Sequence, residues 1–282
     1  MLLGIVLTLS VLTALAVALP ACAFHGLGML WVLPVSFLGT FLGLALITFL
    51  IIWISCACVD MKRAQEKESK YFRFLVQGLA HAAVPITSTH LHTQGLKQTP
   101  KSGRFLLVCN HLNDMDPVVL LRSFPRSQLA FISKRENDKK FLIGPLMRKI
   151  LCQPINREND KEALRTILKC VEILEKDQAS IAVFPEGYIK GDNLLHPFRN
   201  GVFKIAQKTK VPIVVCTLQN TQHIFKNAVR MQPTDVPLHL VKVIEPQEYE
   251  GMNATQIGNM VYALMAEDLG EQNVWHEETA TE

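Results

Sequence analysis

The first 59 residues of this 282-residue chain contain no Asp, Glu, Lys or Arg. All 29 Lys and Arg and all 25 Asp and Glu residues therefore lie in residues 60–282, where they leave a net charge of +4. That charged part, about 220 residues, is long enough to bury the core of one globular domain. The division excludes a transporter embedded in the membrane along its whole length, and it also excludes a plain cytosolic enzyme. It predicts a membrane-anchored protein with one water-facing domain.

The charge-free residues 1–59 divide into two apolar segments, Leu2–Phe24 and Leu30–Val59. As helices they would reach about 34 and 45 Å, and about 30 Å is needed to cross the hydrocarbon core of a bilayer. We therefore expect a two-helix anchor that either spans the membrane twice or enters and leaves one leaflet as a hairpin. A cleavable signal peptide is disfavoured, because no basic residue precedes the first segment and a second apolar segment follows at once.

A cluster of basic residues follows the anchor directly: Lys62, Arg63, Lys67, Lys70 and Arg73. Basic residues beside a membrane segment favour retention on the cytoplasmic side, so we expect the large domain on the cytoplasmic face of the cell (inner) membrane. Apolar residues alternate with these charges, which predicts a basic amphipathic juxtamembrane helix over residues 60–85. The alternative is an ordinary linker helix packed on the domain.

From residue 86 onward, short β-rich runs alternate with helical patterns. This alternation predicts an α/β domain over residues 86–270, with a mixed, mostly parallel sheet flanked by helices. The expected strands are 87–92, 105–109, 129–132, 180–184, 213–217 and 238–244. The expected helices are 117–124, 138–150, 160–176, 201–208 and 254–269. Residues 271–282 are expected to form a flexible acidic tail.

Two strand ends carry side chains suited to catalysis. Asn110-His111 follows the strand 105–109, and Asp116 comes five positions after His111, just before a helix. A turn there would fold the carboxylate back onto the imidazole, fix its tautomer and leave the other ring nitrogen as a general base. The second strand runs into Phe184-Pro185-Glu186-Gly187. In open α/β sheets, reactive residues gather in such loops past the carboxyl ends of strands.

Together these two motifs resemble the paired signatures of the glycerolipid acyltransferases, most closely the bacterial 1-acylglycerol-3-phosphate acyltransferases. Three further blocks resemble other motifs of the family and occur in the same order: Ile155-Asn156-Arg157, Pro197-Phe198-Arg199-Asn200-Gly201 and Val211-Pro212-Ile213-Val214. The resemblance covers roughly residues 60–245, and the apolar N-terminus also suits the family.

The resemblance implies a reaction without a covalent acyl-enzyme. His111 would deprotonate a glycerol hydroxyl, which then attacks the carbonyl carbon of an acyl thioester. Asp116 would orient His111 and stabilise its charge, and Asn110 would help to place the loop or polarise the carbonyl.

The acceptor site follows from the resemblance in the same way. Arg157 would hold the acceptor's phosphate, which needs fork-shaped cationic donors. Glu186 and Gly187 would position its glycerol part. Lys134, after the strand 129–132, is a second candidate for the phosphate.

The expected substrates are 1-acylglycerol 3-phosphate (lysophosphatidic acid) as acceptor and acyl-ACP or acyl-CoA as donor, giving phosphatidic acid for phospholipid biosynthesis. No cofactor, metal or nucleic acid is expected. One departure from the family pattern stands out: Tyr188-Ile189-Lys190 occupies a place where many members have Thr-Arg-Ser.

Three other interpretations remain open. The same chemistry can acylate glycerol 3-phosphate or another lysolipid. A metal-dependent hydrolase would use His90 and His92, which alternate on an expected strand, together with His111 and Asp116. A non-catalytic lipid-binding or scaffold protein would need none of these residues for activity.

Overall fold

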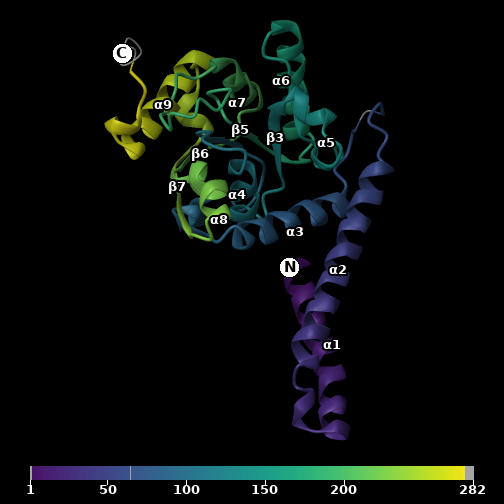
Figure 1. Cartoon of the computed structure of the whole chain (residues 1–282). Helices are drawn as coiled ribbons and strands as arrows, with labels where there is room; N and C mark the ends of the chain where they lie inside the picture. Colours follow the sequence, from purple (N-terminus) through teal and green to yellow (C-terminus); the bar gives the residue numbers. More distant parts are fainter. Residues whose placement is uncertain (1, 64, 277–282) are drawn as a thin grey trace.

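The computed structural model describes residues 2–63 and 65–276, which form an α/β domain and a helical hairpin projecting from it (Figure 1). The hairpin consists of α1 (Leu2–His25) and α2 (Val32–Ala57). Gly26, with a φ of +82°, ends α1 and lets the chain reverse into α2. Both helices are long and apolar enough to cross a membrane, and most of their large side chains are exposed. The two apolar helices predicted for residues 1–59 are thus present, and they pair as a helical hairpin.

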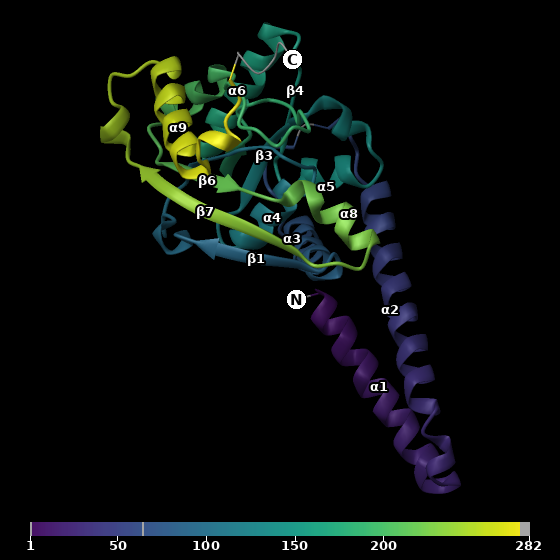
Figure 2. The same ribbon diagram turned by 60° about the vertical axis from the view of Figure 1, so that its left-hand side comes forward.

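The predicted juxtamembrane helix is shorter than expected. Helix α3 runs over Lys70–Ile86 and begins where the Ser69 hydroxyl accepts the N–H of Phe72, while the described residues between α2 and α3, 58–63 and 65–69, form an irregular linker. Phe72 and Leu75 pack against Ile52 and Cys56 of α2, and the buried side of α3 also packs on the domain. Helix α3 therefore joins the hairpin to the domain (Figures 1 and 2).

The described strands form one mixed sheet in the order β1-β7-β6-β2-β5-β3-β4. These strands are β1 (Thr89–Gln94), β2 (Leu106–Cys109), β3 (Leu129–Lys134), β4 (Gln153–Ile155), β5 (Ser180–Val183), β6 (Ile213–Leu218) and β7 (Thr234–Ile244). All the neighbouring pairs are parallel except β6 and β7. The predicted fold class, a mixed and mostly parallel sheet flanked by helices behind an N-terminal hairpin, is confirmed.

The central strands are buried on both faces, as expected of strands in a parallel sheet covered by helices. Along β2, Leu106 and Val108 belong to one apolar cluster, and Leu107 and Cys109 belong to the other, because successive side chains point to opposite faces. Helices α6 (Asp160–Glu175), α7 (Lys204–Thr209) and α9 (Ala254–Leu269) cover the first face. Helices α3, α4 (Asp116–Ser123) and α8 (Ile224–Val229) cover the second.

One predicted helix is divided in the structure, and two short elements were not predicted. The expected helix 138–150 is divided into a 3-10 turn, Arg135–Lys139, and α5 (Ile143–Lys149), because Pro145 fits only the first turn of a helix. Strand β4 has only three residues and includes a proline, so no periodic pattern announces it. Helix α8, with six residues, is likewise too short to show a helical period.

The beginning of the predicted flexible tail is packed on the domain. Val274 is buried and pairs with Leu195 in an isolated bridge, and the Trp275 ring lies 5.7 Å from that of His196. Apolar contact holds this segment, so residues 271–276 depart from the expectation of a free acidic tail. Residues 277–282, the rest of that predicted tail, lie outside the described residues.

Candidate active site

Four candidate side chains lie past the carboxyl ends of four adjacent strands. His111 follows β2, Glu186 follows β5, Lys134 ends β3 and Arg157 follows β4. These strands are consecutive in the sheet and parallel, so their carboxyl ends meet at one edge. The sheet thereby gathers residues that are far apart in the sequence.

The turn between β2 and α4 brings Asp116 onto His111, as the spacing predicts. Asp116 Oδ2 lies 2.8 Å from His111 Nδ1 and also accepts the backbone N–H groups of Leu112 and Asn113, at 2.7 and 2.9 Å. Asp116 is fully buried and is the first residue of α4, where the helix dipole favours a negative charge. The carboxylate is thus held to accept a hydrogen bond from the Nδ1–H group.

His111 presents its other ring nitrogen to a cavity. Its ring stacks on Phe184, with centroids 4.2 Å apart and an angle of 16° between the planes. Only 15% of the side chain is exposed, and Nε2 has no hydrogen-bond partner among the described residues. With Nδ1 bound to a carboxylate, Nε2 is the nitrogen that is free to take a proton from a substrate.

Glu186 lies behind His111 and does not line the cavity. It is buried, and its two carboxylate oxygens accept backbone N–H groups from His111 at 2.8 Å and from His196 at 3.0 Å. Burial raises the pKa of this carboxyl to about 7, and the two backbone hydrogen bonds oppose that shift only in part. Glu186 thus connects the His111 loop to the loop that leads into His196.

Asn110 is also engaged by the protein itself. Its side-chain oxygen accepts the Leu218 N–H at 2.7 Å, and its amide group donates to the Leu218 carbonyl at 2.9 Å. These bonds join the end of β2 to the end of β6. Of the two roles expected for Asn110, this geometry favours placement of the loop, because both polar groups are already paired.

Two arginines lie side by side at the polar end of the cavity. Arg199 Nη1 is 3.5 Å from the carbonyl oxygen of Arg157, and both residues line the cavity. Partial burial and, next, the nearby Arg199 lower the pKa of the Arg157 guanidinium. The two side chains carry like charges, so an anion bound near both would reduce their mutual repulsion.

Gly187 makes room for Arg199. A Cβ atom on Gly187 would lie 3.0 Å from Arg199 Cδ, and the residue has a φ of +86°. The Arg199 guanidinium lies 5.8 Å from the centre of the Tyr188 ring, where a cation is favourably placed. Tyr188 belongs to the segment 188–190, which departs from the family pattern. Its ring therefore contacts Arg199, an arginine that comes from another segment of the chain.

The cavity has a volume of about 1020 Å³ and two chemically distinct ends. Its polar end is lined by His111, Lys134, Arg157, Tyr188 and Arg199. Its apolar end lies between α3, α4 and α5 and is lined by Val76, Leu79, Val118, Leu121, Leu146 and Met147. Lys134 is 63% exposed and lies 3.9 Å from Glu136, so it is less confined than the arginines. This shape suits an anionic group at one end and a hydrocarbon chain at the other.

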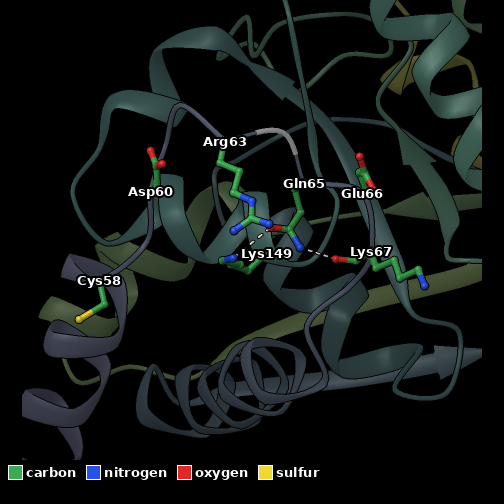
Figure 3. A pocket seen from close by; sticks show the side chains of 7 residues that line it. All are labelled: Cys58, Asp60, Arg63, Gln65, Glu66, Lys67 and Lys149. Carbon is green, nitrogen blue, oxygen red and sulfur yellow. Dashed lines mark hydrogen bonds between the residues drawn. The ribbon is translucent and has the colours of Figure 1, made fainter.

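A second cavity, of about 540 Å³, lies in the linker between α2 and α3 (Figure 3). Side chains of both signs line it, and the Lys149 ammonium donates to the Gln65 side chain at 3.0 Å. It contains no histidine paired with a carboxylate. Of these two cavities, the larger is therefore the one that His111 lines.

The histidines of the metal interpretation lie elsewhere in the fold. His90 and His92 are on β1, where His92 Nε2 lies 2.8 Å and His90 Nδ1 lies 3.6 Å from Asp235 Oδ1. Strand β1 is three strands away from β2 in the sheet, a separation of roughly 14 Å at the usual strand spacing. The sheet therefore does not bring these two side chains to His111 and Asp116.

Comparison with known proteins shows which proteins this chain resembles in sequence. Residues 90–219 match the model of the family described as Acyltransferase. A 1-acyl-sn-glycerol-3-phosphate acyltransferase of Cocos nucifera is 28% identical over 169 residues, which cover 60% of this chain and 54% of that protein. The chain thus spans about half the length of this relative.

Two further relatives cover more of their own length. A probable 1-acyl-sn-glycerol-3-phosphate acyltransferase of Mycoplasma pneumoniae is 27% identical over 210 residues, covering 70% of this chain and 75% of that one. The crystal structure of the 1-acyl-sn-glycerophosphate acyltransferase PlsC from Thermotoga maritima has the same fold. Its TM-score is 0.61 at 22% identity, over 80% of this chain and 89% of that one.

Proposed function

We propose that the chain is a glycerolipid acyltransferase that transfers a fatty acyl group from an acyl thioester to 1-acylglycerol 3-phosphate. The product is phosphatidic acid, made for phospholipid synthesis. The relatives named above support the acyltransferase class and a phosphorylated glycerolipid acceptor.

One observation carries this proposal: a single cavity holds a histidine base, two arginines and an apolar end. His111, with Nδ1 bound to Asp116, faces the same space as Arg157 and Arg199. A hydroxyl acceptor needs the base, a phosphate needs the cations, and an acyl chain needs the apolar walls. The combination matches the three chemical parts of the reaction.

The proposed step needs only the groups that are present. The glycerol hydroxyl oxygen attacks the thioester carbonyl carbon while its proton passes to His111 Nε2. The tetrahedral intermediate then collapses, the carbon–sulfur bond breaks, and the imidazolium returns the proton to the leaving thiolate. The products are an ester and a free thiol. Asp116 stabilises the positive charge that His111 carries between the two proton transfers.

Arg157 and Arg199 are the proposed phosphate site. A phosphate monoester accepts two charge-assisted forks and relieves the repulsion between adjacent guanidinium groups. Lys134 is assigned a weaker contribution, because its ammonium is largely exposed and already near Glu136. In this proposal Glu186 and Asn110 position the His111 loop, and Gly187 gives Arg199 its place.

The hairpin of α1 and α2 supports membrane association. We assign the catalytic domain to the cytoplasmic face, because basic residues such as Lys62 and Arg63 follow the hairpin directly. This face also holds acyl carrier protein and coenzyme A, the two carriers considered for the donor. An acceptor and a product that reside in the bilayer suit an enzyme held at its surface.

The test is an acyl-transfer assay of the purified full chain in lipid vesicles. Lysophosphatidic acid and glycerol 3-phosphate are each paired with acyl-CoA and with acyl-ACP, and phosphatidic acid is measured. We expect transfer to lysophosphatidic acid from at least one donor and none by His111→Ala. Turnover of glycerol 3-phosphate alone would show that the acceptor is this smaller substrate. Near-normal turnover by the variant would overturn the mechanism.

A further inference from the structure

Four large apolar side chains form an exposed patch on the domain, away from the active-site cavity. Ile86 ends α3 and is 69% exposed; Phe225 and Val229 lie on α8 and are 52% and 86% exposed; Met231, in the following turn, is 93% exposed. None of the four lines the cavity. We refer to these residues as the distal patch. Apolar side chains gathered in this way on a soluble surface mark a contact site.

Hydrogen bonds hold the two segments of the distal patch together. The Thr234 N–H donates to the Ser88 carbonyl at 3.1 Å, and the Asn227 side chain donates to the Thr234 hydroxyl at 3.0 Å. The end of α3 and the turn after α8 therefore form one surface. The patch is a built feature of the fold, not the loose end of a loop.

The backbone conformation of Met231 also indicates that the distal patch is a built feature of the fold. Its φ is +53°, in the left-handed region, and its N–H donates to the Ala228 carbonyl at 3.1 Å. A residue with a side chain costs on the order of 1 kcal/mol there compared with glycine. The fold thus accepts strain to end α8 with a methionine that points into solvent.

The distal patch lies at the end of the domain from which the hairpin projects. Both views show α3 crossing this end, with the turn between α8 and β7 at the same level (Figures 1 and 2). At the other end of α3, Tyr71 and Phe74 are exposed beside α2. Ile86 is therefore separated from these two side chains by roughly 18 to 22 Å along α3, at 1.5 Å per residue.

The charge around the distal patch is positive. Lys226 and Arg230 are exposed and lie four residues apart on and just after α8, so they share one side of the helix. The nearest acidic residue along the chain, Asp235, is already paired with His92 at 2.8 Å. Exposed apolar side chains flanked by basic ones are suited to the interface of a bilayer that contains anionic lipids.

We propose that the distal patch is a second contact with the membrane, made with the surface of an anionic phospholipid bilayer. Val229 and Met231 enter the headgroup region, while Lys226 and Arg230 contact lipid phosphates. With the hairpin near one end of α3 and the distal patch at the other, the domain is held at two separated places. This fixes its tilt on the bilayer, which the hairpin alone leaves free.

The test places one tryptophan in the distal patch and another at a control position. Val229→Trp is compared with Glu250→Trp, an exposed position beyond the far end of β7. Each full-length variant is reconstituted in phosphatidylglycerol vesicles whose acyl chains are brominated near the headgroup. The unsubstituted protein is subtracted to remove the signal of its own tryptophans. We expect the emission added at residue 229 to be blue-shifted and quenched at least twofold, and that at residue 250 to be unchanged by bromine.

Two further measurements examine the effect of the basic side chains and the self-association of the protein. Lys226→Gln with Arg230→Gln should reduce the quenching at residue 229 in phosphatidylglycerol, whereas phosphatidylcholine vesicles should show little quenching with or without these changes. Equal quenching at residues 229 and 250 would overturn the proposal. Unquenched tryptophan emission at residue 229 in a protein that sediments as a dimer would also overturn the proposal, because a second copy of the chain would then cover the distal patch.

Discussion

The Glu186 carboxylate accepts the backbone N–H of His111 at 2.8 Å, so a second acidic residue holds the proposed catalytic histidine through its main chain. Asp116 holds the ring of the same histidine at 2.8 Å. The other oxygen of Glu186 accepts the His196 N–H at 3.0 Å. One buried carboxyl group therefore determines how two loops meet beside the cavity, and its protonation state should matter for both.

Glu186 should make folding stability depend on pH. Its folded pKa of about 7 lies above the ordinary value of 4.5, so the folded protein keeps this proton over a range in which the unfolded chain has lost it. Stability from this group is therefore complete below pH 4.5, falls as the pH rises through about 7, and is constant above that. The loss across this window is on the order of 3 kcal/mol.

Thermal unfolding of wild type and Glu186→Gln between pH 4.5 and 8 measures this effect. The amide cannot titrate, so the wild-type midpoint should fall by several degrees relative to that of the variant as the pH rises. Glu250→Gln, on the exposed surface, should follow the wild type. Parallel curves for wild type and Glu186→Gln would show that the buried carboxyl does not titrate in this range.

Replacement of the histidine should remove activity without unfolding the protein. General base catalysis is worth about 10² to 10⁴-fold, so His111→Ala should lower kcat by at least a hundredfold. Asp116→Asn should lower kcat by a comparable factor, because the amide stabilises neither the correct tautomer nor the imidazolium. Steady-state rates with saturating acceptor give both numbers. His223→Ala, an exposed histidine outside the cavity, serves as the control and should keep full activity.

Short-range features of the site could be predicted from the sequence. The return of Asp116 to His111 needs only a turn of a few residues, and the Asn113 side chain supports that turn by accepting the Met115 N–H at 3.0 Å. The central parallel strands β2, β3 and β5 could be predicted as well, since each is a largely buried run of mostly apolar residues. Both follow from neighbours along the chain.

The other contacts of the site depend on the order of the strands in the sheet, which no local sequence pattern determines. Glu186 bonds to a residue 75 positions away, and Asn110 bonds to one 108 positions away. The sequence therefore suggested substrate contacts for two residues whose polar groups are bound by the protein. The position of Arg199 beside Gly187 and Arg157 could not be predicted for a similar reason, because these residues come from separate segments of the chain.

Asn110 should contribute to stability more than to substrate binding. Asn110→Ala removes both bonds to Leu218 and leaves that buried backbone unpaired, at a cost of about 1–3 kcal/mol for each group. The unfolding midpoint should fall by several degrees, while the KM for the acceptor stays within about twofold of wild type. Asn110→Asp retains an acceptor for the Leu218 N–H but has no donor for its carbonyl, so it should also be destabilised. A large rise in KM with an unchanged midpoint would show that Asn110 contacts substrate directly.

Alanine substitutions at two glycines can distinguish the effect of backbone strain from the effect of displacing Arg199. Gly187 and Gly191 have φ values of +86° and +87°, so alanine costs each about 1 kcal/mol of backbone strain. They differ in their surroundings: a Cβ on Gly187 would meet Arg199 Cδ at 3.0 Å, whereas a Cβ on Gly191 would have nothing within 4 Å. Only Gly187→Ala should therefore displace the arginine.

Gly187→Ala should raise the KM for lysophosphatidic acid by about tenfold, which corresponds to roughly 1.4 kcal/mol of lost phosphate binding. Gly191→Ala should lower the unfolding midpoint by a similar amount but leave KM close to the wild-type value. Arg199→Ala supplies the reference, and adding Gly187→Ala to it should cause little further rise, because the arginine is already gone. Equal changes in KM for the two glycine variants would mean that strain, and not the position of Arg199, controls acceptor binding.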